Sequence, residues 1–182
     1  MAYSVLLHDE RVSGNTPDLD DTTGFTVEET DPIDRILGWV GYCHKQKGQI
    51  EDLKIICHGY VSATNGRGGH GLELGKDEVH LSNVNKWVAI RGMANYILVY
   101  ACRAADVDPA VSADIGNGKQ LCSKLAAATG ATVFAAVRTQ YYDKRLSPWH
   151  WREIDMGDWE GPVYTFRPDG TVTNISPWVG DD

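Results

Sequence analysis

The sequence has 182 residues, of which 42% are hydrophobic and 23% charged, a composition that fits one ordinary globular domain with its own core. Its formal net charge of −8 argues against a nucleic-acid-binding surface, because such surfaces gather Lys and Arg against phosphates. The four cysteines are too few and too scattered for a disulfide scaffold, so we expect free thiols.

The first residues carry neither a basic leader nor an apolar run long enough for a signal peptide. No run approaches the length of a membrane span. We therefore expect a cytoplasmic chain without membrane insertion, and export as an effector would have to proceed without a leader. The sequence leaves the oligomeric state open.

The N-terminal third predicts a strand, a loop and a helix. Residues 3–7 predict the strand, and residues 13–30, rich in Asp, Thr and Gly without helical period, predict a surface loop. Thr30-Asp31-Pro32 predicts the start of a helix that runs to about residue 46, with an apolar stripe that Cys43 continues.

Two apolar runs rich in Ile, Val and Tyr, residues 53–57 and 96–101, predict buried strands of a parallel sheet. The first ends at His58-Gly59 and the second at Cys102. Ligands of open α/β sheets bind at the carboxyl ends of the strands. We therefore expect His58 and Cys102 to meet there, although they are far apart in the sequence.

The segments between and after these strands complete an α/β pattern. A Gly-rich passage at 65–71 leads to a predicted hairpin at 72–81 and a short helix that Ser82 and Asn83 can cap. After a loop at 104–117, residues 118–129 predict an amphipathic helix that Gly130 ends, and residues 131–137 predict a third buried strand.

This order of elements predicts a three-layer α/β/α sandwich, with a mostly parallel central sheet, right-handed crossovers and helices on both faces. We expect one domain over 1–182, with its core at about 50–140 and a Trp-rich segment at 149–182. That segment contains a predicted hairpin, 163–166 and 171–173, turned at 167–170. Its tryptophans, Trp149, Trp151, Trp159 and Trp178, are expected to fill a core or an interface.

Cys102 and His58 have the chemistry of a nucleophile and its base. A thiol attacks a carbonyl at neutral pH when its pKa is lowered or when a base stands beside it, and imidazole is the natural base. The oxyanion that forms needs preorganised N–H donors, for which the backbone amides of Gly59 and Cys102 are the candidates.

These residues resemble the caspase-like cysteine peptidases, the group that includes caspases, metacaspases, gingipain, separase, self-cleaving toxin domains and bacterial CHAT domains. The shared pattern is an apolar strand ending in His-Gly and, some forty residues later, a second ending in Ala-Cys. Tyr100-Ala101-Cys102-Arg103-Ala104 is similar to the caspase signature Gln-Ala-Cys-Arg-Gly. Residues 69–75 resemble the hairpin after His-Gly in bacterial members, and the resemblance covers about residues 50 to 140.

The resemblance implies a caspase-like fold in which Cys102 is the nucleophile, His58 the general base and Gly59 an oxyanion donor. It implies a protein or peptide substrate and no cofactor. Tyr100 and Arg103, which flank Cys102, and His70 in the Gly-rich passage are the candidate substrate-binding residues. Because Tyr100 stands where caspases have Gln and metacaspases Asp, the residue preferred before the cut stays open.

Two other functions fit the same residues: a caspase-like fold kept as a binding or scaffold module with an idle thiol, and a cysteine-dependent acyl transferase or esterase. No metal site is expected, because the spacings of His70 and His80 with the nearby Cys and Glu residues fit no standard zinc pattern.

Overall fold

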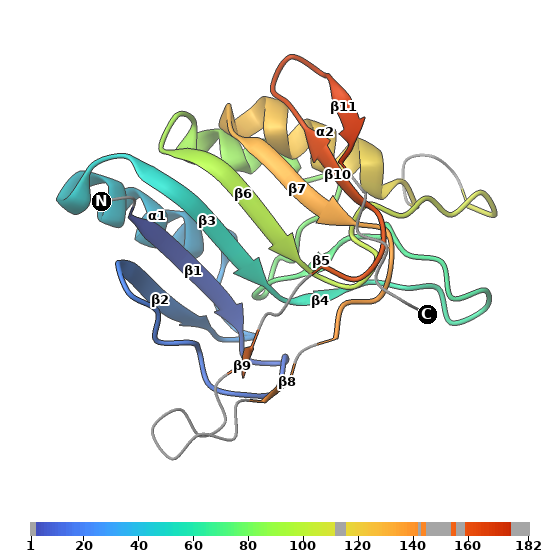
Figure 1. Cartoon of the computed structure of the whole chain (residues 1–182), viewed down its shortest axis with the longest axis horizontal. Helices are drawn as coiled ribbons and strands as arrows, with labels where there is room; N and C mark the ends of the chain where they lie inside the picture. The colour runs from blue at the N-terminus through green and yellow to red at the C-terminus, as the bar shows by residue number, and fades with distance from the viewer. Residues whose placement is uncertain (1–2, 112–115, 142, 145–153, 156–158, 176–182) are drawn as a thin grey trace.

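A seven-stranded sheet organises the structure, in the order β11-β10-β7-β6-β3-β1-β2 (Figure 1). The computed structural model describes residues 3–111, 116–141, 143–144, 154–155 and 159–175. The strands of the sheet are β1 (Ser4–Asp9), β2 (Thr22–Val27), β3 (Ile50–Ile56), β6 (Ala94–Tyr100), β7 (Thr132–Ala136), β10 (Val163–Phe166) and β11 (Val172–Asn174). The first five run parallel, and β10 and β11 are antiparallel to their neighbours. The predicted mostly parallel sheet is confirmed.

Three helices are described: α1 (Ile33–Lys47), the 3₁₀ helix η1 (Val84–Ile90) and α2 (Gly118–Thr129). The remaining elements are four two-residue strands, β4 (His58–Gly59), β5 (Leu72–Glu73), β8 (Asp143–Lys144) and β9 (Ile154–Asp155).

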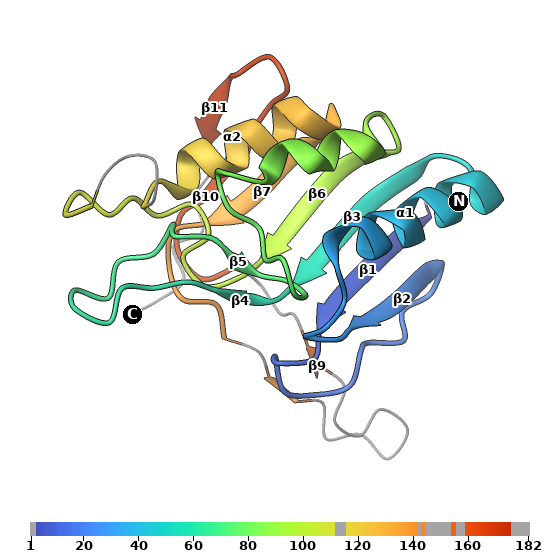
Figure 2. The same cartoon turned by 180° about the vertical axis from the view of Figure 1, so that it is seen from behind.

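All three described helices cover one face of the sheet, as the two opposite views show (Figures 1 and 2). The helical crossovers, β2 to β3, β3 to β6 and β6 to β7, all move the same way across the sheet. A right-handed crossover therefore places each helix on the same side. The step from β1 to β2 moves the opposite way, and its connection, residues 10–21, contains no helix. The described residues thus supply one of the two helical layers predicted from the sequence.

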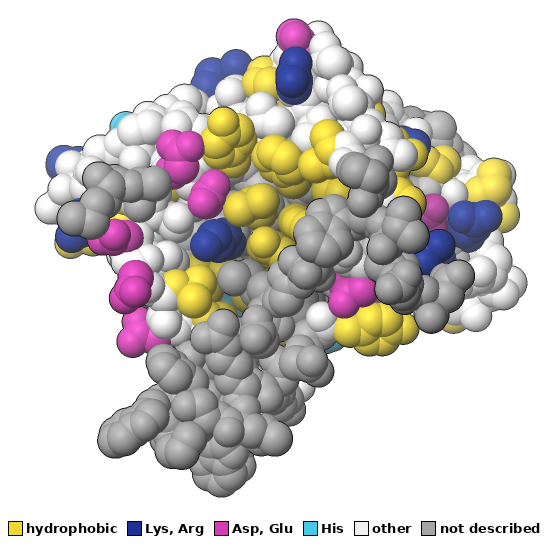
Figure 3. All heavy atoms as spheres, in the orientation of Figure 1, with side chains coloured by type: hydrophobic (Ala, Val, Ile, Leu, Met, Phe, Trp, Pro, Cys, Tyr) yellow, Lys and Arg dark blue, Asp and Glu magenta, His cyan; other side chains and the backbone are white. Residues whose placement is uncertain are grey.

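Alternation along the strands separates the two faces. Leu53 and Ile55 of β3 belong to the main core cluster, which also contains the buried side chains of all three helices. Ile56 points the other way, into a second cluster with Leu6 and Val12, against which Tyr100 packs. Hydrophobic side chains gather on this helix-free face (Figure 3).

The loop predicted at 13–30 is wrong in its second half, where β2 pairs with β1 in parallel. The strand lies at the edge of the sheet and only Val27 in it is buried, so its sequence lacks the apolar run typical of a central strand. Phe25 stacks on Trp39 of α1 at a centroid distance of 5.1 Å. A tertiary contact therefore supports a strand that the local pattern does not indicate.

The hairpin predicted at 72–81 is reduced to a single bridge between Leu72 and Val79, and β5 pairs with β4 instead. The remaining predicted elements differ less. The short helix predicted after Ser82 and Asn83 is the 3₁₀ helix η1, and the predicted side-chain cap is absent, because the Asn83 Oδ1 atom accepts from the His80 N–H instead. Asn117 caps α2 by accepting from the N–H of Gln120, and Gly130 follows in the left-handed conformation. The C-terminal hairpin forms as β10 and β11. Of the four tail tryptophans, Trp149, Trp151 and Trp178 lie outside the described residues.

In the part of the chain that the structure describes, no helix is long and apolar enough to cross a membrane.

Candidate active site

The ends of β3 and β6 bring His58 and Cys102 to the same edge of the sheet. The two strands are parallel neighbours with Ile56 opposite Tyr100, and the Cys57 N–H continues the ladder to the Tyr100 carbonyl at 3.3 Å. One step further along the chain, the backbones of Gly59 and Cys102 touch: a Cβ atom added to Gly59 would overlap the Cys102 carbonyl oxygen. Only glycine fits this contact without displacement of the backbone.

This edge is also a topological switch point of the sheet. The chain leaves β1 toward β2 and leaves β3 in the opposite direction toward β6, so the connections diverge between the two strand ends. Ligands of open α/β sheets bind in such crevices. Arg11 follows β1 and His58 follows β3, so both residues lie at the switch point.

Cys102 is half-buried, in contrast to the other three cysteines, which are buried. Its thiol donates to the carbonyl of Gln140 at 3.6 Å. Among the described residues, no acceptor takes the Cys102 backbone N–H, so this amide is available to an oxyanion. Cys102 is therefore partly exposed at the strand end, with its N–H unpaired among the described residues.

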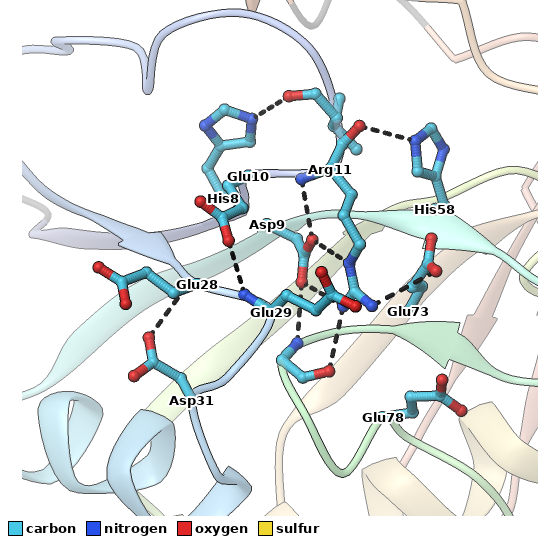
Figure 4. A network of polar contacts seen from close by, with 12 residues as sticks. His8, Asp9, Glu10, Arg11, Glu28, Glu29, Asp31, His58, Glu73 and Glu78 are labelled. Carbon is cyan, nitrogen blue, oxygen red and sulfur yellow. Dashed lines mark hydrogen bonds and ion pairs between the residues drawn. The ribbon is translucent and has the colours of Figure 1, made fainter.

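His58 is exposed, and its Nε2 atom lies 3.1 Å from the carbonyl oxygen of Arg11 (Figure 4). A carbonyl only accepts, so Nε2 carries the hydrogen and Nδ1 is the basic nitrogen of the neutral ring. Among the described residues, no hydrogen bond joins the Cys102 sulfur to the His58 ring, and the thiol donates to the Gln140 carbonyl instead. For the thiol to donate to His58, it would have to turn away from that carbonyl.

Arg11 is fixed by the groups around it. Its Nε and Nη2 atoms donate to the two oxygens of Asp9 at 2.7 and 2.8 Å, and Nη2 also reaches the Gly75 carbonyl at 3.1 Å. Nη1 pairs with Glu73 at 3.3 Å. The Asp9 side chain is fully buried. Burial alone would raise the pKa of Asp9, but hydrogen bonds from Arg11 and from the Gly75 N–H outweigh it and hold the pKa below its ordinary value.

A second polar group lies beside Arg11, around Glu78. Tyr60 donates a short hydrogen bond to one oxygen of Glu78, and His80 contacts the other at 2.6 Å. Burial, followed by the hydrogen bond to Glu78, raises the pKa of Tyr60. Tyr60 therefore remains a neutral donor at physiological pH.

The three predicted substrate-binding residues have different surroundings. The Tyr100 ring stacks on Trp159 at a centroid distance of 4.4 Å on the helix-free face. His70 contacts Asp108 through Nε2 at 3.2 Å, and its side chain is 17% exposed. Arg103 lines a pocket. Arg103 therefore faces a cavity, whereas His70 and Tyr100 contact Asp108 and Trp159 of the protein itself.

The pocket has a volume of about 540 Å³. Its charged lining consists of three arginines, Arg67, Arg103 and Arg138, and two acids, Asp106 and Glu160. The other lining residues are Val137, Thr139 and Tyr141. Two of the lining residues, Arg103 and Thr139, are the chain neighbours of Cys102 and Gln140, which are not themselves part of the lining. Its polar lining suits a polar or charged side chain better than a large apolar one.

Arg103 has a left-handed backbone, with φ of 52°, which is uncommon for a residue with a long side chain. Its N–H donates to the Arg138 carbonyl at 2.9 Å, and its guanidinium lies 3.5 Å from Asp106. Backbone strain of this kind is often found at functional sites. Here it turns the chain away from the sheet directly after Cys102.

Sequence reasoning missed Arg11, Gln140 and Arg138. A signal for Arg11 existed, since the first predicted strand also ends at this edge and is followed by His8-Asp9. Gln140 and Arg138 follow the strand predicted at 131–137, and no local pattern connects them with Cys102.

In the described residues, no three side chains of His, Cys, Asp or Glu are grouped so that they could hold a metal ion. No protein-family model matches the chain, and no curated protein matches it in sequence.

Proposed function

We propose that this protein is a cysteine endopeptidase of caspase-like type, with Cys102 as nucleophile and His58 as general base. The observation that carries the proposal is that the half-buried Cys102 and the exposed His58, whose Nε2–H is held by a backbone carbonyl, follow neighbouring parallel strands at one edge of the sheet. This orientation leaves Nδ1 as the proton acceptor, the protonation state that a general base needs.

The reaction begins when the thiol leaves the Gln140 carbonyl and transfers its proton to His58 Nδ1. The sulfur bonds to the peptide carbonyl carbon, and the oxyanion accepts hydrogen bonds from the amides of Cys102 and Gly59. The C–N bond then breaks as His58 returns the proton to the leaving amine, which gives a thioester. Water, deprotonated by His58, attacks the thioester, releases the carboxylate and restores the thiol.

The pocket that Arg103 lines would suit a substrate that has a polar or charged side chain near the scissile bond. Arg103 and Arg138 are the residues through which the chain would contact that side chain. No cofactor takes part in these steps.

One observation favours a second function. The hydrogen bond from Cys102 to Gln140, rather than to His58, is what an idle thiol in a binding module would also show. An acyl transferase or esterase would use the same dyad, and only the acceptor or the leaving group would differ.

The test is digestion of a peptide library by the wild-type protein and by the variants Cys102→Ala, His58→Ala and Cys43→Ala. Cys43 is a buried thiol in α1 and serves as the control. We expect cleavage by wild type and Cys43→Ala, and a loss of at least about 100-fold in Cys102→Ala and His58→Ala. Cleavage of simple esters or thioesters without peptides would favour the esterase. No turnover, together with equal alkylation of Cys102 and Cys43, would favour the binding module.

A further inference from the structure

The strand end after β1 contains an ion pair whose geometry is tied to the His58 ring (Figure 4). The backbone N–H and the guanidinium of Arg11 both bind Asp9, at 3.1 Å and at 2.7 to 2.8 Å. The carbonyl of the same Arg11 accepts the His58 Nε2–H. The position of this carbonyl therefore depends on how firmly the rest of Arg11 is held.

The same guanidinium also fixes the strand beside His58. In the antiparallel pair of β4 and β5, His58 lies opposite Glu73, and Glu73 forms an ion pair with Arg11. Arg11 further binds the Gly75 carbonyl, while the Gly75 N–H donates to Asp9 at 2.8 Å. The ring of His58 and the strand paired with its backbone are thus connected to one side chain.

The burial of Asp9 makes this arrangement rigid. Its carboxylate is fully buried and Arg11 is 20% exposed, so solvent competes little for either partner. A bidentate guanidinium–carboxylate pair also fixes orientation as well as distance. An exposed pair with a single contact would leave the carbonyl of Arg11 free to move.

We propose that Asp9 and Arg11 are positioning residues that hold the Arg11 carbonyl against His58 Nε2 and so keep Nδ1 as the basic nitrogen of the ring. The inference rests on the proposed function, because this tautomer matters for a general base. Asp9 and Arg11 act only through His58 and need not touch the substrate.

The first measurement is the tautomer of His58, read from the ¹⁵N chemical shifts of its imidazole ring. It is made on the full-length chain that carries Cys102→Ala, at about pH 8. The His58→Asn variant assigns the signals. We expect the Nε2–H tautomer to dominate in this background, and both tautomers to be populated once Arg11→Ala or Asp9→Asn is added. Arg11→Lys, which keeps the charge beside Asp9 without the planar fork, should give an intermediate result.

The second measurement is the rate at which iodoacetamide alkylates Cys102 in chains that keep this thiol. We expect Arg11→Ala and Asp9→Asn to slow it about 10- to 100-fold, since small misplacements of a catalytic group have effects of this size. Arg11→Lys should recover part of the rate. If Arg11→Ala does not fold, Arg11→Lys and Asp9→Asn carry the test.

Arg35→Ala is the matched control, because Arg35, on α1, pairs at 2.8 Å with Asp31, another buried carboxylate. It should leave both the tautomer and the alkylation rate unchanged. Unchanged tautomer and rate in all Arg11 and Asp9 variants would overturn the inference, even if Cys102 depends on His58. A tautomer that responds while Cys102 stays inert would keep the positioning role and refute the peptidase.

Discussion

Cys102 has surroundings that none of the other cysteines shares. Cys43, Cys57 and Cys122 are buried within the main core cluster, whereas Cys102 is half-buried at a strand end. Burial raises the pKa of the Cys57 thiol, and it raises the pKa of Cys122 to about 12. Because the thiolate is the reactive form, these two thiols are inert in the native protein.

We predict that iodoacetamide modifies Cys102 selectively in the folded protein at neutral pH. For Cys122, a pKa of about 12 leaves only roughly 10⁻⁵ of the thiol ionised near pH 7. Peptide mass spectrometry over a time course measures each site, and the unfolded protein in urea is the control in which all four should react. Equal rates for Cys122 and Cys102 in the native state would contradict the prediction.

Asp9 also gives a prediction for stability. Since its pKa is lowered on folding, the ionised form stabilises the folded state above the unfolded pKa of about 3.9. This stabilisation is lost as the pH falls through the lower, folded value. We expect Asp9→Asn to lower the free energy of unfolding by about 2 kcal/mol at neutral pH.

The difference between wild type and Asp9→Asn should begin to narrow near about pH 4, where Asp9 of the unfolded chain becomes protonated, and should disappear as the pH falls through the lower pKa of the folded state. Urea unfolding at a series of pH values measures it. Asp18→Asn, at an exposed position of the loop that follows β1, is the control and should change little. A difference that stays constant into acid would show that charge is not the cause.

At the scale of elements, the contact between β4 and the end of β6 is the one that the site depends on. A Cβ at Gly59 would overlap the Cys102 carbonyl, a backbone atom that cannot rotate away. We expect Gly59→Ala to cost about 1 to 3 kcal/mol of stability and to slow alkylation of Cys102. Thermal unfolding and the alkylation rate together measure both effects.

Gly38→Ala is the matched control, because a Cβ at this exposed position of α1 meets nothing within 4 Å. Alanine favours a helix, so this variant should gain up to about 1 kcal/mol and leave Cys102 reactivity as it is. If Gly59→Ala behaved like Gly38→Ala, the close approach of the two strand ends would be refuted.

The helices and strands show which parts of the fold a local sequence pattern predicts. The strands that end at His58 and Cys102 were predictable because continuous apolar runs are typical of a sheet covered by helices. The strand β2 was not, because its residues are mostly half-exposed and its Phe25 is stabilised by a ring of α1. The 3₁₀ form of η1 likewise followed no local signal, since 3₁₀ and α turns share most residue preferences.

At the scale of the whole molecule, one core connects most elements of the described chain. The main cluster contains residues from β1, β2, β3, β5, β6, β7 and β10 and from all three described helices. The smaller cluster on the helix-free face is built on β1 and β3, which also contribute to the main cluster. Small proteins of this kind usually unfold in a single transition.

We therefore predict that unfolding in urea gives one transition with the same midpoint by far-UV circular dichroism and by tryptophan fluorescence. The first signal follows the helices and the sheet, and the second includes Trp87, which is fully buried in the core. Trp87→Phe, measured by both methods, shows how much of the fluorescence change belongs to this residue. Separate midpoints would show that the sheet and the helical layer unfold independently.

The sequence by itself determined the parallel strands, the amphipathic helices and the two strand ends that carry His58 and Cys102, because these features follow from local periodicity and turn chemistry. Only the tertiary structure decided which groups surround them. The Arg11 carbonyl on His58, the Gln140 carbonyl on Cys102 and the single described helical layer depend on strand order and on contacts between distant segments. Such contacts have no local pattern, since hydrogen bonding to a backbone carbonyl requires no particular side chain.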